Sequence, residues 1–278
     1  MQPKKERTKK TVCHTWDYLR LINVPEMPPR TCPFDPGYDP ITLESHLDQS
    51  SHLISTLKIS MACWLIANEK ATRKKVAAAR RLKIPVCTGG GPFEIAVAFG
   101  RLREFLDLCS DIGVTRIEAG EGFTDMEMKP TEVVRMAEKR GLDVQFEIGK
   151  KHEGVFRGNV VEGLIDQGKR WLDAGAKQIV VEARESAAGV GVFDQKGVLN
   201  TRVAEKFASA FGMEATVFEA PNKKSQFAFL NHFGPEVYLS NVRLEELLRV
   251  EIYRRGLHSD AFQHDNLRPK GKPVNTAF

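Results

Sequence analysis

Four glutamates in this chain stand at the ends of apolar segments that read as short buried strands. Each is followed by a small or charged residue and then by a loop, as in VQFEIGKK at 144–151. A helix-like stretch separates each glutamate from the next, and the spacings are 29, 35 and 37 residues. This rhythm predicts repeated β/α units whose polar groups collect at one end of a sheet. The four residues are Glu118, Glu147, Glu182 and Glu219.

Cationic side chains accompany these glutamates. Lys151 follows Glu147 by four residues, and alternate residues of a strand share a face, so we expect the two side chains to point the same way. Lys58, Arg184 and Lys223 also follow predicted strands. Buried charges are costly unless they are paired or used in chemistry, which makes this group a candidate site.

This balance of charges suits a divalent metal together with a phosphate or carboxylate substrate. Mg²⁺ takes only one or two protein carboxylates and completes its octahedron with other oxygens, including those of substrates. The sequence leaves open which of the four glutamates bind the metal and which only pair with Lys151 and Arg184. The seven histidines form no metal-binding motif, and we interpret His152 as a loop residue.

Two further features are candidates for binding a phosphate group. A triple glycine precedes a predicted helix, where backbone N–H groups approach an anion closely; a tight turn is the alternative interpretation. The loops after the last two predicted strands often bind phosphate in a β/α barrel, although an asparagine there also suits a helix cap. The residues are Gly89, Gly90, Gly91, Asn222, Lys223 and Asn241.

Predicted strands and helices alternate along the whole chain. Strands are expected at 30–34, 54–60, 84–87, 114–119, 143–148, 177–183, 215–219 and 236–240. Helices are expected at 41–53, 67–82, 92–110, 130–140, 157–173, 200–211, 223–233 and 243–255. Eight such units in 278 residues predict a (β/α)8 TIM barrel, a closed parallel sheet with outer helices and an active site at the carboxyl ends of the strands. A doubly wound open sheet is the alternative, but the chain has no dinucleotide fingerprint.

The ends of the chain differ from its middle. Residues 1–40 are basic and rich in proline, and we expect an irregular extension that wraps the barrel bottom or a neighbouring subunit of a homo-oligomer. The barrel is predicted over 41–262 and a polar tail over 263–278. Much of the net charge of +5 lies in the first ten residues and in RPKGK at 268–272, so we do not expect nucleic-acid binding.

The composition fits a cytoplasmic enzyme. No apolar run reaches about 18 residues, and no apolar segment follows the basic start, so neither a membrane span nor a secretory signal is expected. The five cysteines are scattered and odd in number, which predicts reduced thiols rather than disulfides or a zinc site.

Seven motifs, in order along the chain, resemble those of the phosphosulfolactate synthases, the enzymes that add sulfite to phosphoenolpyruvate in coenzyme M or sulfolactate biosynthesis. They are GGGPFE (89–94), IEAGEGFTD (117–125), EIGKK (147–151), VEARESAAGVGVFDQKG (181–197), FEAPNKKSQFAF (218–229), GPEVYLSN (234–241) and EIYRRGLHSDAF (251–262). The resemblance implies a (β/α)8 barrel, dependence on Mg²⁺, and a product that is 2-phospho-3-sulfolactate. It also implies that Lys151 is catalytic, with support from Arg184 and Lys58.

The mechanism that we expect is a magnesium-assisted conjugate addition in which Lys151 gives a proton to the adduct. Whether neighbouring cations lower the pKa of Lys151 or Glu147 holds it charged is left open by the sequence. Several positions depart from the family pattern. Lys58 is followed by ISMAC in place of Gly-Trp-Gly-Thr, Gly91 replaces a threonine, and Glu121 replaces an aspartate at the substrate site.

These departures keep two alternatives open. One is a phosphoenolpyruvate-using enzyme with a different second substrate, since fewer hydroxyl groups would hold a strongly hydrated anion such as sulfite less well. The other is a non-catalytic family member that serves as a stress or interaction scaffold. The charged motifs oppose the second alternative, because a scaffold has no physical need for so many charges at one barrel mouth.

Overall fold

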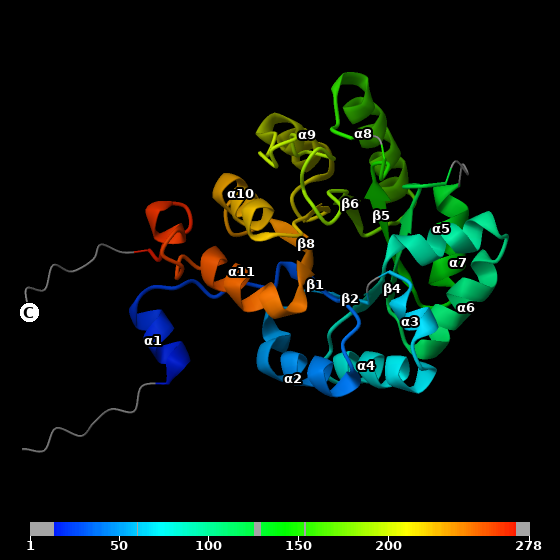
Figure 1. Cartoon of the computed structure of the whole chain (residues 1–278), viewed down its shortest axis with the longest axis horizontal. Coiled ribbons are helices and arrows are strands. Elements are labelled where there is room, and N and C mark those ends of the chain that lie inside the picture. Colours follow the sequence, from blue (N-terminus) through cyan, green and yellow to red (C-terminus); the bar gives the residue numbers. More distant parts are fainter. Residues whose placement is uncertain (1–13, 60, 125–128, 153, 271–278) are drawn as a thin grey trace, which may run out of the picture.

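The structure, a computed structural model, describes residues 14–59, 61–124, 129–152 and 154–270. Eight parallel strands form a closed barrel in which each strand pairs with its neighbours in sequence and β8 pairs with β1 (Figure 1). The strands are β1 (Thr31–Asp35), β2 (Leu57–Ile59), β3 (Val86–Thr88), β4 (Arg116–Gly120), β5 (Asp143–Ile148), β6 (Gln178–Val181), β7 (Thr216–Glu219) and β8 (Tyr238–Arg243). The prediction of a (β/α)8 barrel is confirmed, and the open sheet is wrong.

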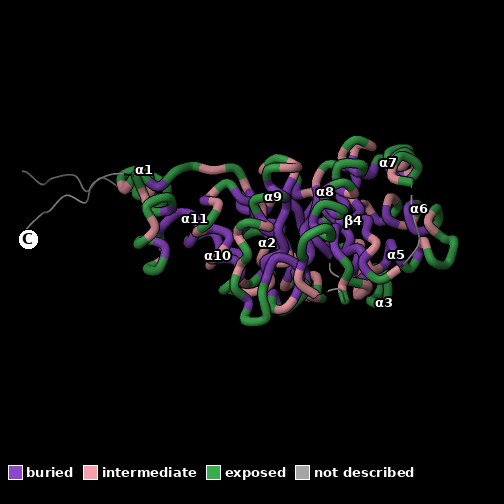
Figure 2. The backbone as a smooth tube through the Cα atoms, turned by 90° about the horizontal axis from the view of Figure 1, so that it is seen from above, coloured by how far each residue is buried: buried purple, intermediate pink, exposed green. Residues whose placement is uncertain are grey.

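Helices surround this barrel, and the buried residues concentrate between them and the strands (Figures 1 and 2). The α-helices are α1 (Thr15–Leu21), α2 (Pro40–Ser50), α3 (Cys63–Ile66), α4 (Glu69–Arg81), α5 (Gly90–Ala98), α6 (Leu102–Ile112), α7 (Pro130–Glu138), α8 (Gly158–Asp173), α9 (Thr201–Phe211), α10 (Lys223–Phe233) and α11 (Leu247–Arg254). Short 3-10 helices are η1 (Ser51–Leu53), η2 (Leu244–Glu246) and η3 (Ala261–Gln263). No helix in the described ranges is long and apolar enough to cross a membrane.

Local sequence accounts for several of these helix boundaries. Asp39 caps α2 by accepting a hydrogen bond from the backbone of Ile41 at 2.9 Å, and Pro40 occupies the first helical turn. The helix predicted at 92–110 is instead two helices. The chain breaks at Gly100, whose φ of +66° is a left-handed conformation that favours glycine.

The amino-terminal segment is less irregular than predicted. It contains α1, and the first barrel strand β1 also lies before residue 40. The cysteines that the structure describes are free thiols, and Cys13 lies outside the described residues. The predicted polar tail is described only as far as residue 270.

A buried ionic cluster closes the barrel at the amino ends of its strands. Glu251 of α11 pairs with Arg254 at 3.1 Å and accepts a hydrogen bond from Thr31, the first residue of β1, at 2.6 Å. Arg254 also donates to the backbone carbonyls of Val237 and Pro235 at 2.8 and 2.5 Å. The side chain of Arg254 is fully buried. Through these contacts it connects α11 to β1 and to the residues just before β8.

We therefore expect Arg254→Ala to lower the free energy of unfolding by about 3–5 kcal/mol, because Glu251 and two carbonyls lose a buried donor. Urea denaturation measures this loss. The matched control is Arg268→Ala, because Arg268 pairs with Asp265 on the surface, and its effect should stay within about 0.5 kcal/mol. Equal effects of the two substitutions would contradict the assigned role of the cluster.

Candidate active site

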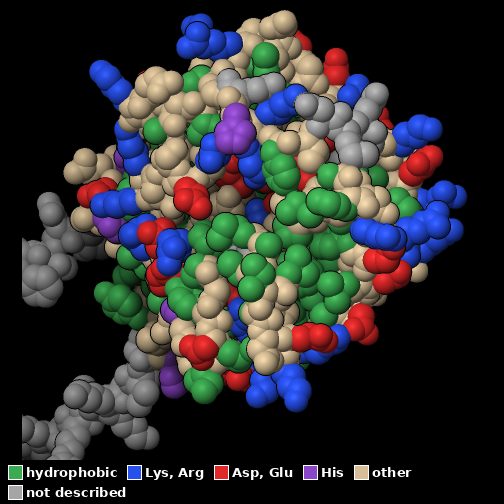
Figure 3. All heavy atoms as spheres, turned by 45° about the vertical axis from the view of Figure 1, so that its right-hand side comes forward, with side chains coloured by type: hydrophobic (Ala, Val, Ile, Leu, Met, Phe, Trp, Pro, Cys, Tyr) green, Lys and Arg blue, Asp and Glu red, His purple; other side chains and the backbone are tan. Residues whose placement is uncertain are grey.

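A cavity of about 1150 Å³ opens at the carboxyl ends of the strands. Cationic and histidine side chains border one side of the hollow in Figure 3, and hydrophobic side chains border the other. The predicted site residues that line it are Lys58, Gly90, Gly91, Glu118, Glu147, Lys151, Glu182, Arg184, Glu219 and Asn241. The barrel thus brings together residues that are up to 183 positions apart in the chain.

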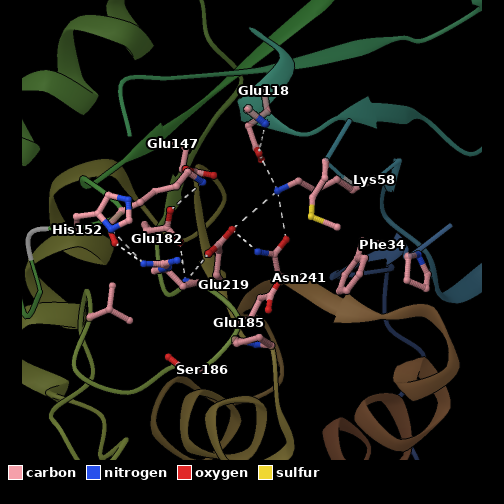
Figure 4. Close-up of a pocket in the computed structure, with 18 of the residues that line it drawn as sticks. Phe34, Lys58, Glu118, Glu147, His152, Glu182, Glu185, Ser186, Glu219 and Asn241 are labelled. Carbon is pink, nitrogen blue, oxygen red and sulfur yellow. Dashed lines mark hydrogen bonds and ion pairs between the residues drawn. The ribbon is translucent and has the colours of Figure 1, made fainter. Parts of the chain in front are cut away.

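Lys58 of β2 lies at the centre of one charged group (Figure 4). Its Nζ is 2.7 Å from Glu118 Oε1 and 3.8 Å from Glu219 Oε1. Asn241 of β8 accepts from Lys58 at 3.2 Å and donates to Glu219. Burial disfavours the charge on Lys58, but the two glutamates outweigh it and raise the pKa of the lysine well above 10.5.

The triple glycine contributes to this group through its backbone. Gly90 begins α5, and its N–H donates to Glu118 Oε1 at 2.9 Å. The amino end of α5 therefore holds a carboxylate of the protein itself. Gly91 lines the cavity, and a Cβ there would meet nothing within 4 Å. A Cβ at Gly89 would lie 3.2 Å from the backbone nitrogen of Met61.

Lys151 lies at the centre of a second charged group. Its Nζ is 3.2 Å from both Glu147 Oε1 and Glu182 Oε2. The turn that carries it depends on Gly149, whose φ is +107° and where a Cβ would lie 2.4 Å from the Phe156 ring. Burial disfavours the charge of Lys151, but Glu147 and Glu182 outweigh it and raise the pKa of the ammonium. Of the two possibilities left open by the sequence, this pairing with carboxylates favours a charged Lys151.

The three glutamates around Lys151 differ in their protonation. Burial and the neighbouring charge of Glu182 raise the pKa of Glu147 and of Glu219 well above the usual range. Burial opposes ionisation of Glu182 as well, but Lys151 and hydrogen bonds from the other two glutamates lower its pKa to about 2. The three carboxyl groups are therefore unequal: the pKa of Glu182 is lowered, whereas the pKa values of Glu147 and Glu219 are raised.

Arg184 is placed by its backbone as much as by its side chain. Its N–H donates to Glu182 Oε1 at 2.6 Å and to Glu219 Oε2 at 3.2 Å. Its guanidinium donates to the carbonyl of Lys151 at 2.9 Å. Arg184 and Asn241 both have left-handed φ angles, 55° and 53°. Such conformations in non-glycine residues cluster at functional sites, where the surroundings hold them in place.

Four predicted binding residues do not line the cavity, and Gly89 is one of them. Glu121 accepts a hydrogen bond from Gln167 of α8 at 2.8 Å. Asn222 caps α10 through Ser225, as the alternative interpretation proposed, and also donates to Ser186 O at 2.9 Å. Lys223 is half-exposed and lies 3.6 Å from Asp260. The structure therefore gives no support to direct substrate binding by Glu121, Asn222 or Lys223.

Several lining residues were missed. His152, interpreted as a loop residue, lines the cavity with its Nδ1 3.5 Å from an Arg184 nitrogen. Arg243 follows Asn241 by two residues on β8, so strand alternation could have identified it. Phe34 lies in β1, and Ile95 lies on the exposed side of α5. Neither apolar side chain could be recognised from the sequence as lining the cavity.

The glutamates also differ in their capacity to hold a metal. Both oxygens of Glu118 are occupied, by Lys58 and Gly90 on one side and by Gln145 at 2.8 Å on the other. Both oxygens of Glu219 are likewise occupied. Among the described residues, no three acidic, histidine or cysteine side chains are arranged around a possible metal position. Glu147 and Glu182 share the ammonium of Lys151, although Glu182 also accepts from the Arg184 N–H. These two glutamates are the remaining candidates, and two carboxylates are within what Mg²⁺ uses.

Solved structures with similar folds have low sequence identity to this chain, so they show the fold alone. A type I 3-dehydroquinate dehydratase from Clostridium difficile aligns with a TM-score of 0.51 at 15% identity, over 82% of this chain and 92% of that one. Dihydropteroate synthase from Thermus thermophilus aligns with a TM-score of 0.50 at 17% identity, over 81% of this chain and 93% of that one.

Sequence comparisons are more specific. Residues 25–260 match the family model described as (2R)-phospho-3-sulfolactate synthase (ComA). The phosphosulfolactate synthase of Methanocaldococcus jannaschii is 30% identical over 233 residues, which are 84% of this chain and 93% of the relative. The phosphosulfolactate synthase of Bacillus subtilis is 27% identical over 229 residues, which are 82% and 90% of the two chains. The chain therefore belongs to the phosphosulfolactate synthase family of enzymes.

Proposed function

We propose that this protein adds a nucleophile, sulfite in the family reaction, to phosphoenolpyruvate and so forms 2-phospho-3-sulfolactate. The observation that carries the proposal is the pair of lysines in one large cavity, the buried Lys58 and the partly buried Lys151, each held among glutamates. Phosphoenolpyruvate is a small, highly charged anion, and a cavity with fixed cations would concentrate it. The family membership supports the same reaction.

The cationic side of the cavity is suited to the phosphate and the carboxylate of phosphoenolpyruvate. Arg184 and Arg243 line the cavity and are exposed to solvent. A guanidinium can bind either group through two parallel hydrogen bonds. Lys58 and Lys151 are less exposed, and neighbouring carboxylates favour their charged forms. This arrangement would orient the methylene carbon toward the open cavity, from which the nucleophile arrives.

We propose that Mg²⁺ binds at Glu147 and Glu182, while Glu118 and Glu219 serve as ion-pair partners of Lys58. When bound, the ion would supply positive charge that offsets the negative charge developing on the carboxylate side of the substrate. Both glutamates now face Lys151, so the same two carboxylates would hold the metal and adjust the position of the lysine.

Lys151 would then act as the general acid. The nucleophile forms a bond to the methylene carbon, and the electron pair of the double bond moves to the adjacent carbon. An ammonium proton of Lys151 is delivered to that carbon, which completes the addition. The raised pKa of Lys151 ensures that it carries this proton at neutral pH.

The identity of the second substrate is less constrained than that of the first. Phe34, Met61 and Ile95 form an apolar part of the cavity lining, and Gly91 offers no hydroxyl group. Met61 occupies a turn with a φ of 48° and is 55% exposed. Trp64, in contrast, packs in the core beside Phe105 and does not line the cavity. We propose that sulfite, if used, binds away from the apolar side, which leaves room for a larger nucleophile.

Lys151→Ala is expected to lower turnover by about 10²–10⁴-fold, because the general acid is lost, while the far-ultraviolet circular dichroism stays unchanged. Turnover is measured from formation of the sulfonated product. Lys206→Ala is the matched control, since Lys206 pairs with Glu162 on the surface and its removal should leave turnover unchanged. A folded Lys151→Ala enzyme with near-normal turnover would refute the assignment.

Calorimetric titration distinguishes an enzyme from a non-catalytic scaffold. Phosphoenolpyruvate with Mg²⁺ is expected to bind to the wild-type protein, and Glu147→Gln/Glu182→Gln should lose the dependence on Mg²⁺. Glu132→Gln, an exposed change on α7, controls for the loss of negative charge. Absence of any heat of binding in the wild-type protein would favour the scaffold.

Product analysis decides the second substrate. Enzyme, Mg²⁺ and phosphoenolpyruvate are incubated with sulfite and, separately, with thiols and other anions, and products are followed by mass spectrometry. If the apolar lining selects the nucleophile, a larger one should outcompete sulfite, and Met61→Gly should reduce that preference. Efficient formation of phosphosulfolactate with no better nucleophile would leave the family reaction unchanged in this protein.

A further inference from the structure

Glu94 is a buried carboxylate beside the site that neither the charge pairs nor the proposed mechanism uses. It lies in α5, at the end of the GGGPFE motif, and is 1% exposed. Its Oε2 accepts hydrogen bonds from the backbone N–H groups of Phe123 and Thr124 at 2.9 and 3.1 Å, and from the Thr124 hydroxyl at 3.2 Å. Glu94 therefore fixes the loop that follows β4.

The other oxygen of Glu94 has no such partners. Among the described residues, no donor lies within hydrogen-bonding distance of Oε1, although it is buried. A buried polar atom without a partner is costly, and one in a native protein calls for an explanation. This oxygen is directed at the end of β4: it lies 3.4 Å from the position that a Cβ would take at Gly120, and 3.3 Å from that position at Gly122.

Lys151 also lies beside Gly122. Its Cε and Cγ are 3.1 and 3.2 Å from the same Cβ position, and its backbone N–H donates to the carbonyl of Gly122 at 2.9 Å. The unpartnered oxygen of Glu94 and the Lys151 side chain thus lie within contact distance of the same point, the position that a Cβ would take at Gly122. The glycine at 122 keeps this space open.

We propose that Glu94 is a positioning residue for Lys151: it holds the Gly122 carbonyl against the lysine backbone, and its Oε1 receives the ammonium when Glu147 and Glu182 are engaged elsewhere. The inference rests on the role proposed for Lys151. A partly buried ammonium that left both carboxylates without a replacement would be destabilised. Rotation about the terminal bonds of Lys151 would carry its ammonium from Glu147 and Glu182 to Glu94.

A crystal structure of Glu147→Gln/Glu182→Gln tests the movement without substrate or metal. Removing both carboxyl groups should turn the ammonium toward Glu94, with Nζ at about 2.7–3.2 Å from Oε1. An ammonium that stays between the two glutamines, or that turns to solvent, would overturn the proposal. Because this result needs no turnover, it stands apart from any failure to detect the proposed reaction.

Kinetics of Glu94→Gln provide the second measurement, should the double variant not fold. The amide oxygen can still accept from Phe123 and Thr124, while the amide nitrogen replaces the oxygen that faces Lys151. We expect kcat to fall by about 10–100-fold, as for other groups that orient a reacting residue, with KM for phosphoenolpyruvate and the melting temperature nearly unchanged. Glu104→Gln, on the exposed face of α6, is the matched control.

A purely structural role for Glu94 predicts a different pattern. Glu94→Gln would then match the wild-type kcat, and only Glu94→Ala, which removes the loop contacts, would lower the melting temperature and activity together. That outcome would overturn the proposal.

Discussion

The structure depends on the pairing of two lysines at the barrel mouth, the buried Lys58 and the partly buried Lys151, with carboxylates that come largely from other strands. Lys58 is nearly inaccessible to water, so it must have Glu118 and Glu219 beside it to remain charged. These residues come from β2, β4 and β7, and Asn241 adds β8. The charges at the mouth can therefore be satisfied only if the barrel closes, and closure in turn creates the site.

Charge is used differently at the two ends of the barrel. At the amino ends, Glu251 and Arg254 are fully paired with each other, with Thr31 and with backbone carbonyls, which leaves no group available for a ligand. Glu251 and Arg254 of the EIYRRGLHSDAF motif therefore have a structural role. At the carboxyl ends, the lysines face an open cavity and share carboxylates of unequal protonation. Such unequal groups are suited to proton transfer and cation binding.

The backbone around the site is shaped for these contacts. Gly149 permits the turn that brings Lys151 back over β5, and Arg184 adopts a left-handed conformation that directs its N–H to two carboxylates. Asn222, which follows β7, donates a hydrogen bond to Ser186 O in the segment after β6 and so joins these two loops. The cationic side of the cavity is thus built on fixed backbone, which favours precise placement of a small anion.

Much of the site could be predicted from the sequence because its residues obey local rules. Parallel strands of a β/α repeat place their carboxyl ends together, so Glu118, Glu147, Glu182 and Glu219 had to lie near one another once the repeat was identified. The same rule placed Lys58 and Lys151. It failed for Glu121 and Lys223, because a loop side chain can turn outward to a helix or to solvent.

The sequence by itself therefore determined the barrel, the set of charged residues at its mouth and, through its motifs, the family. Only the tertiary structure decided which glutamate pairs with which lysine, because those pairings cross between strands whose register and spacing are set by closure of the sheet. It also decided the surroundings of Glu94, a helix residue with no strand-end signal. The contact between α5 and the loop after β4 brings this carboxylate to Lys151, and no local pattern encodes that contact.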